Sequence, residues 1–178
     1  MKTIAHGCLM ILLAASTAFA ASVHLKGGKN AKPTFVDNGV TLSAFGELSG
    51  LGNGDVLITM DAEADVTSTC TNNGGNAAPG QNPAPITVSG SQAIPDEQVK
   101  NGSTPFSVIT LPPQTIIPGA PDCPNSTWVE EISDLAFTSA VITVEQPAGN
   151  VVMVATCSFD PATEDGNVPK QTVSCQQL

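Results

Sequence analysis

The side chains that catalysis most often needs are scarce in this sequence. His24 is the one histidine after residue 20, and Arg and Tyr are absent. A serine or cysteine nucleophile is usually activated by an imidazole that stands between it and a carboxylate. His24 lies only a few residues after the cleavage site proposed below, where an exposed or edge-strand polar residue is the simpler interpretation. We therefore predict no catalytic residue and a protein that is not an enzyme.

Neighbouring carboxylates offer a second kind of chemistry. Glu130 and Glu131 are adjacent, and two carboxylic acids can share the acid and base roles in glycoside hydrolysis. Sugar sites usually present aromatic platforms, however, and this chain has one Trp and no Tyr. A small secreted hydrolase or an enzyme inhibitor stays as the alternative function, and it would require polar groups that converge in a cleft.

Residues 160–167 contain the best candidates for metal ligands. Calcium takes about six to eight oxygen atoms from carboxylates and carbonyls. Candidate donors in this segment are Asp160, Glu164, Asp165 and Asn167. The segment does not match an EF-hand loop, and a solvated hairpin tip is the simpler interpretation. Calcium is a side hypothesis, and no other cofactor is expected.

Residues 1–20 have the pattern of a secretory signal peptide. Lys2 supplies a positive charge, residues 8–15 are apolar, and Ala18 and Ala20 are the small residues that a signal peptidase reads. The apolar run is too short to cross a bilayer, which takes about 20 residues. We predict a single domain over residues 21–178 that is exported to the periplasm, the cell surface or the medium, without membrane insertion.

Four cysteines follow the predicted signal peptide: Cys70, Cys123, Cys157 and Cys175. An even number of cysteines in an exported chain indicates disulfides, and three pairings are open. We favour Cys157 with Cys175, because alternation places both sulfurs on facing sides of a predicted hairpin, and Cys70 with Cys123. The shorter of these loops would contribute roughly 3 kcal/mol, mostly by restricting the unfolded chain.

The charge of the chain limits its partners. The formal net charge is −10 at pH 7, and binding to phosphate backbones requires clustered cations. We therefore exclude nucleic acid and anionic membranes as partners. Another protein, a surface polymer or a second copy of the chain remains open.

Period-two alternation dominates the rest of the chain, as in half-buried strands. In residues 56–66, apolar residues at 58, 60, 62, 64 and 66 point one way, and acidic Asp61, Glu63 and Asp65 point the other. The other expected strands are residues 33–36, 40–48, 86–89, 106–111, 136–145, 151–159 and 171–175, and short helical turns are expected at 96–100 and 127–134. Turn sequences rich in Asn and Gly separate the strands. We predict an all-β fold, an antiparallel β-sandwich of about seven to nine strands, Ig-like in the broad sense and braced by disulfides.

Two long stretches lack this alternation. Residues 71–85 are rich in Asn, Gly and Pro, and residues 112–127 contain five prolines. Loops of this length are usually functional, held by a covalent link, or disordered. A disulfide between Cys70 and Cys123 would hold both loops at one end of the domain. Their surface residues are Asn72, Asn76, Gln81, Asn82, Asn125 and Trp128.

Several short motifs occur together in this sequence. They are Val-His-Leu-Lys-Gly-Gly-Lys-Asn-Ala-Lys-Pro-Thr-Phe (23–35), Gly-Leu-Gly-Asn-Gly-Asp (50–55), Cys-Thr-Asn (70–72), Gly-Gly-Asn (74–76), Pro-Gly-Gln-Asn-Pro (79–83), Cys-Pro-Asn (123–125), Trp128 and Phe-Thr-Ser-Ala (137–140). Together they resemble a family of small exported bacterial proteins without an assigned function. The resemblance covers nearly the whole chain after the signal peptide. It implies an exported bacterial domain and transfers no catalytic residue.

The sequence therefore favours a non-enzymatic binding or structural domain. Loops on a rigid scaffold commonly carry binding function. We expect this domain to act through residues 71–85 and 112–127.

Overall fold

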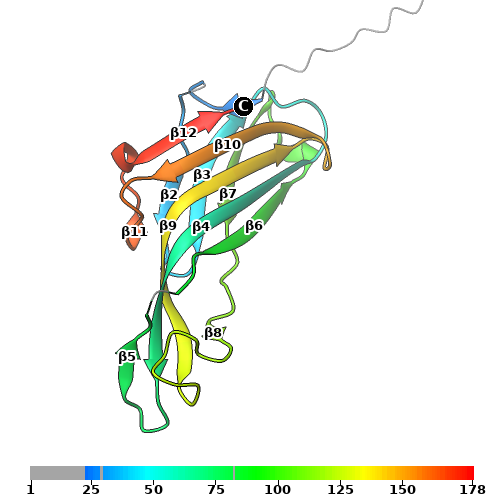
Figure 1. The fold of residues 1–178 in the computed structure, drawn as a ribbon. Coiled ribbons are helices and arrows are strands. Elements are labelled where there is room, and N and C mark those ends of the chain that lie inside the picture. The colour runs from blue at the N-terminus through cyan, green and yellow to red at the C-terminus, as the bar shows by residue number, and fades with distance from the viewer. Residues whose placement is uncertain (1–22, 29, 82) are drawn as a thin grey trace, which may run out of the picture.

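The computed structural model describes residues 23–28, 30–81 and 83–178. In these ranges the chain forms 12 β-strands and two short 3-10 turns, η1 (Asp96–Gln98) and η2 (Lys170–Thr172), and no α-helix. All strand pairs are antiparallel, and they build two sheets that face each other (Figure 1). The predicted all-β sandwich is confirmed, with more strands than expected. The predicted signal peptide lies outside the described residues.

The smaller sheet is centred on β3 (Leu42–Ser49). One edge of β3 pairs with β7 (Ser103–Ile109). The other edge pairs with β2 (Thr34–Asp37) and with β1 (His24–Leu25), and β11 (Gly166–Asn167) pairs with β2.

The larger sheet is centred on two long strands, β4 (Val56–Thr71) and β9 (Val129–Glu145), which pair along their whole length. Next to β4 lies β6 (Ile86–Ile94), and beyond β9 lie β10 (Val151–Phe159) and β12 (Val173–Gln177). The far halves of β4 and β9 extend out of the sandwich, where β5 (Ala77–Pro79) pairs with β4 and β8 (Ile116–Ile117) pairs with β9 (Figure 1). We call this extension, residues 66–81 and 111–134, the arm.

Alternating side chains form the core between the sheets. In β4, Met60, Ala62 and Ala64 are fully buried, whereas the acidic residues at 61, 63 and 65 are exposed, as the sequence predicts. Phe35 of the smaller sheet meets Phe159 of the larger one edge to face, with ring centroids 5.0 Å apart. Burial of such apolar surface, at about 25 cal/mol per Å², is the main force that holds the two sheets together.

Both predicted disulfides are confirmed. Cys157 and Cys175 are directly opposite residues of β10 and β12, with Cα atoms 4.1 Å apart. Cys70, at the end of β4, is bonded to Cys123 of the loop before β9. The pairing of Cys157 follows from the alternation, since a shift by one residue would have moved its side chain to the other face of the sheet.

One local expectation is wrong. The helical turn expected at residues 127–134 is instead the first part of β9, which begins at Val129. Its inward positions are Glu130 and Ile132, and both are buried. Because a glutamate occupies one of these core-facing positions, the apolar alternation that marks a strand is not visible there. No helix among the described residues is long and apolar enough to cross a membrane.

Candidate functional site

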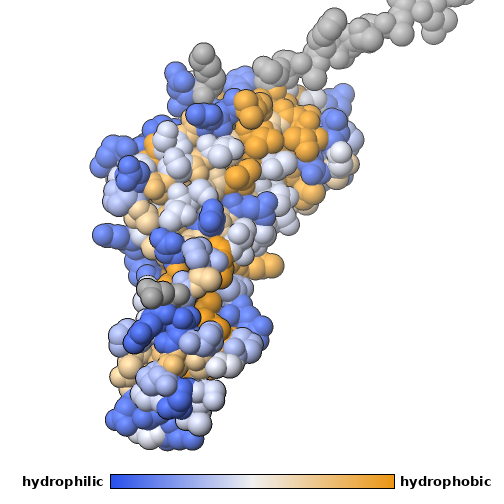
Figure 2. All heavy atoms as spheres, in the orientation of Figure 1, coloured by the Kyte–Doolittle hydropathy of each residue, from blue (hydrophilic) through white to orange (hydrophobic). Residues whose placement is uncertain are grey.

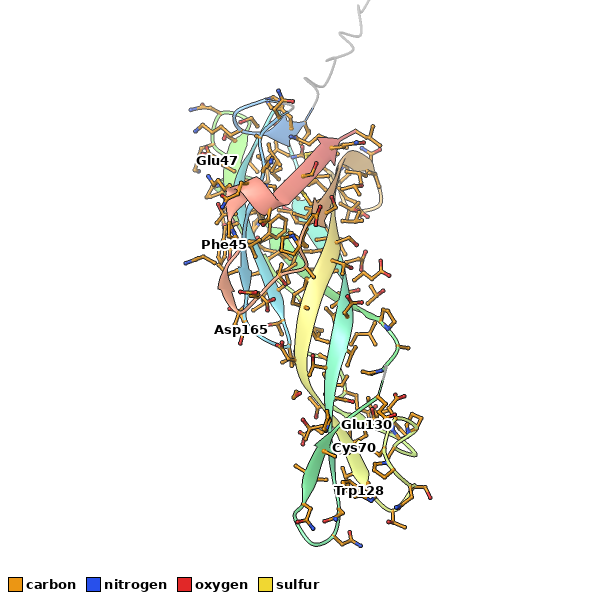
Figure 3. All side chains as sticks on the ribbon, turned by 60° about the vertical axis from the view of Figure 1, so that its left-hand side comes forward. Phe45, Glu47, Cys70, Trp128, Glu130 and Asp165 are labelled. Atoms are coloured by element: carbon orange, nitrogen blue, oxygen red, sulfur yellow. A yellow bond between two sulfur atoms is a disulfide. The ribbon has the colours of Figure 1, made fainter. Side chains whose placement is uncertain are left out.

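The two predicted loops come together in the arm. Residues 71–85 and 112–127 are joined by the disulfide between Cys70 and Cys123, whose Cα atoms are 5.6 Å apart. The backbone N–H of Gln81 also donates a hydrogen bond to the carbonyl of Asp122, at 3.1 Å. Figure 3 shows Cys70 and Trp128 on the arm, away from Asp165 on the sandwich. The expectation that a disulfide holds both loops at one end is confirmed.

The asparagines of these loops mainly shape turns. The side-chain oxygen of Asn72 accepts hydrogen bonds from the backbone N–H groups of Gly74 and Asn76, both at 2.9 Å. Likewise, the side-chain oxygen of Asn125 accepts from the backbone N–H of Thr127, at 3.1 Å. Asparagine commonly stabilises turns in this way. These two amide oxygens are therefore already used within the chain.

The other predicted loop residues are spread over the arm. Asn76 and Gln81 are exposed, and Trp128 is half-buried. Trp128 precedes Val129, which pairs with Thr71 at the far end of the ribbon. Asn82 lies outside the described residues. These side chains do not form one cluster. A binding site on the arm therefore has to be a feature to which other residues contribute.

Glu130 of β9 binds the loop that contains Asp122. Its carboxylate is fully buried and accepts hydrogen bonds from the hydroxyl of Ser68, at 2.8 Å, and from the backbone N–H of Asp122, at 3.2 Å. A buried carboxylate needs such partners, because removal from water penalises its charge. Glu131 points to the opposite face and is exposed, since successive residues of a strand alternate. The two glutamates thus do not form the acid and base pair considered from the sequence.

A groove of about 690 Å³ lies where the arm leaves the sandwich. Among its lining residues are Val66 of β4 and Ile132 of β9. One side is formed by the start of β6, with Ile86 and Val88, and the other by residues 111–118, which we call the strap. The strap begins where the backbone N–H of Leu111 donates to the carbonyl of Ser89, at 2.8 Å, and leads into β8. We call this feature the arm groove.

The arm groove is aliphatic and nearly uncharged. Among the described residues that line it, Asp122 is the only ionisable one and none is aromatic. Within the described residues, no group donates a hydrogen bond to the Asp122 side chain. Figure 2 shows hydrophobic residues gathered at this junction of sandwich and arm. Sequence reasoning placed residues 112–127 in a functional loop, but it did not reveal the groove, whose other walls come from distant strands.

The calcium candidates lie elsewhere, on the sandwich. Asp160, Glu164, Asp165 and Asn167 are exposed around the segment that leads into β11. No group of three or more His, Cys, Asp or Glu side chains in the described part of the chain is arranged to hold a metal ion. The calcium hypothesis therefore gains no geometric support.

Three aspartates gather around the turn at Gly39, which sequence reasoning missed. Asp37 is buried, with 3% of its surface exposed, and accepts hydrogen bonds from the Thr163 hydroxyl and from the Gly39 N–H. Carboxylate oxygens of Asp134 and Asp165 lie next to Gly39. Burial raises the pKa of Asp37, and the negative charges of Asp134 and Asp165 add to this effect, against the two hydrogen bonds.

This raised pKa predicts a specific pH dependence for D37N. Because the folded state holds the Asp37 proton more tightly than the unfolded chain does, ionisation of Asp37 destabilises the fold as the pH rises. The stability of the wild type relative to D37N should therefore be greatest below pH 3.8 and should fall as the pH rises through the raised pKa of Asp37. Urea unfolding of both proteins between about pH 3 and 7 measures the difference. A difference that stays flat or grows with pH would contradict the effect of burial on Asp37.

Comparison with known proteins gives no relative to guide the assignment: no protein-family model, no curated protein and no solved structure matches this chain.

Proposed function

We propose that this protein is an exported, non-enzymatic binding domain that holds its ligand in the arm groove. The observation that carries the proposal is a preformed aliphatic groove of about 690 Å³ between β6 and the strap. Small-molecule sites have volumes of about 300–1,000 Å³ and are mostly apolar, with few polar groups. Both loops that the sequence singled out contribute to the lining, residues 71–85 through Pro83 and Ala84 and residues 112–127 through the strap. The disulfide at Cys123 holds the loop that follows the strap to the end of β4.

The walls of the groove favour binding without large rearrangement. Prolines contribute much of the lining: Pro83, Pro112, Pro113, Pro118 and Pro121. Proline has a fixed φ and few backbone conformations. A wall built from it loses little conformational entropy when a ligand binds, which favours affinity.

The chemistry of the groove supports binding over catalysis. General acid–base or nucleophilic catalysis needs at least two cooperating groups at a reacting centre. The lining residues that the structure describes offer one carboxylate and no His, Lys or Cys. Export is part of the proposal, and it is supported by the two disulfides, which are typical of oxidising compartments.

Two matched isoleucines provide the test. Ile116 lines the groove and is 44% exposed, whereas Ile109 of β7 is 52% exposed and lies outside it. I116R places a charge in the aliphatic wall and narrows the groove, and I109R is the control. Exposed substitutions of this kind usually change stability by no more than about 0.5 kcal/mol, which thermal unfolding verifies.

The variants are compared as immobilised proteins exposed to medium and envelope extract of the producing organism, and the retained compounds are identified by mass spectrometry. We expect wild type and I109R to retain the same compound, and I116R to retain about tenfold less of it, because burying the guanidinium is unfavourable. Equal retention by all three proteins would show that the groove is not the binding site.

A further inference from the structure

The shape of the arm groove limits the size of its ligand. A volume of about 690 Å³ accepts one small molecule or a short chain. A protein–protein interface is generally an extended surface of about 800 Å² on each partner, whereas a concave groove is typical of a small-molecule site. The ligand is therefore a compound that enters the groove, not a folded surface that covers it.

The walls determine the body of the ligand. Residues of three strands, Val66, Val88 and Ile132, line the groove together with Leu111 and Ile116 of the strap. The described walls of the groove present no aromatic ring that could stack on a sugar or hold a proline-rich peptide. An aliphatic or alicyclic body fits these walls, because transfer of apolar surface from water is the main gain that they offer.

The charge around the groove determines the head group. Asp122 is the one ionisable residue in the described part of the lining, and the chain carries a net charge of −10 at pH 7. The Asp122 carboxylate receives no hydrogen bond from the described residues, while the backbone of this residue is fixed to Glu130 and Gln81. A cation near it is attracted, and an anion is repelled by Asp122 and by the overall charge.

We propose that the arm groove binds a small amphiphile with an aliphatic or alicyclic body and one cationic amine, which lies at Asp122. The proposal rests on the proposed function, since it assigns a ligand class to the same groove. A half-exposed charge pair contributes modestly, so the amine should bind about threefold to tenfold more tightly than an uncharged compound with the same body.

Three probes that share a ten-carbon alkyl chain test this assignment: decylamine, decanol and decanoate, each below the concentration at which it forms micelles. Binding to the exported chain is followed by NMR through the methyl resonances of Ile86, Val88 and Ile132. We expect affinity to fall from decylamine to decanol to decanoate. D122N should lower the affinity for decylamine to that for decanol and leave decanol binding unchanged. I116R should weaken the binding of decylamine and decanol, and I109R should match the wild type.

The outcomes separate this inference from the proposed function. If the three probes bind the groove equally and D122N changes nothing, the groove is a binding site and the amine assignment is wrong. If no probe shifts these methyl groups, the amphiphile assignment is wrong, whereas the retention experiment still decides the function. If wild type forms a dimer that I116R disrupts, as sedimentation would show, a second copy occupies the groove and the inference is also overturned.

Discussion

Replacing Cys70 and Cys123 together with alanine is expected to cost about 4 kcal/mol of the free energy of unfolding. The disulfide closes a loop with a sequence separation of 53 residues, and the entropy that a crosslink removes from the unfolded chain grows with loop length. It is also the covalent link between β4 and the loop that follows the strap. The variant should therefore unfold at lower denaturant concentration and also lose the arm groove.

The second disulfide is the matched control. Cys157 and Cys175 enclose a separation of 18 residues within the sandwich, so the double alanine variant should lose about 3 kcal/mol. Because this bond lies away from the arm, it should leave decanol binding in the groove unchanged. Urea unfolding and probe titration on both variants make the comparison. If both variants bind the probe equally well, the disulfide at Cys70 does not hold the groove in shape.

The second large effect is expected at Gly90, where β6 of the larger sheet lies close against the end of β7 of the smaller sheet. A Cβ atom at this position would lie 1.9 Å from the backbone carbonyl oxygen of Ile109. Backbone atoms of β7 cannot move aside as a side chain can, so G90A has to push β6 and β7 apart. We expect a loss of about 3 kcal/mol, at the upper end for overpacked sites. The strap should also be displaced, because the hydrogen bond from Leu111 to Ser89 adjoins this contact.

G52A is the control for this substitution. The nearest atom to a Cβ at Gly52 is the side-chain oxygen of Gln146, at 3.7 Å, which is ordinary van der Waals contact. The same chemical change should therefore alter the free energy of unfolding little at Gly52. Equal stability of G90A and the wild type in urea unfolding would mean that the close approach of β6 and β7 is not a constraint on the fold.

Together these variants connect the scaffold to the proposed site. The sandwich positions β6, and the paired strands β4 and β9 extend from it to form the arm. The disulfide between Cys70 and Cys123 holds the loop that follows the strap to the end of β4. Glu130 adds a second attachment, because the backbone N–H of Asp122 binds its carboxylate. Asp122 is thus held at the groove by its own hydrogen bond to Glu130 of β9 and by the disulfide between the adjacent Cys123 and Cys70 of β4.

Much of the fold follows from local alternation. The strand expected at residues 151–159 is β10 with the same bounds, and the alternation of residues 56–66 continues as the first part of β4. The same alternation placed Cys157 opposite Cys175. These features depend on which face of a strand each residue occupies, and period two determines this from the sequence alone.

The arm was harder to predict for two local reasons. Residues 67–71 (Thr-Ser-Thr-Cys-Thr) continue β4 with hardly any apolar contrast, because Ser68 occupies a buried position. On the facing strand, Glu130 occupies another buried position and is hydrogen-bonded to Ser68. A polar pair that hydrogen-bonds to itself inside the arm leaves no hydrophobic signal. The alternation therefore predicts a strand that ends at residue 66, before Ser68, and a helical turn at residues 127–134 in place of the strand that contains Glu130.

The sequence by itself determined the all-β architecture, because this depends on alternation, and the even number of cysteines indicated disulfides. It favoured the two observed pairings and two loops at one end without excluding the other pairings. Only the tertiary structure decided the arm groove and the aspartate cluster. Val66 and Ile132 line the groove together with a strap from a third part of the chain, and Asp37 meets Thr163 across a separation of 126 residues. Such contacts arise when two sheets pack and a ribbon extends beyond them, and no local pattern encodes which distant side chains then share one space.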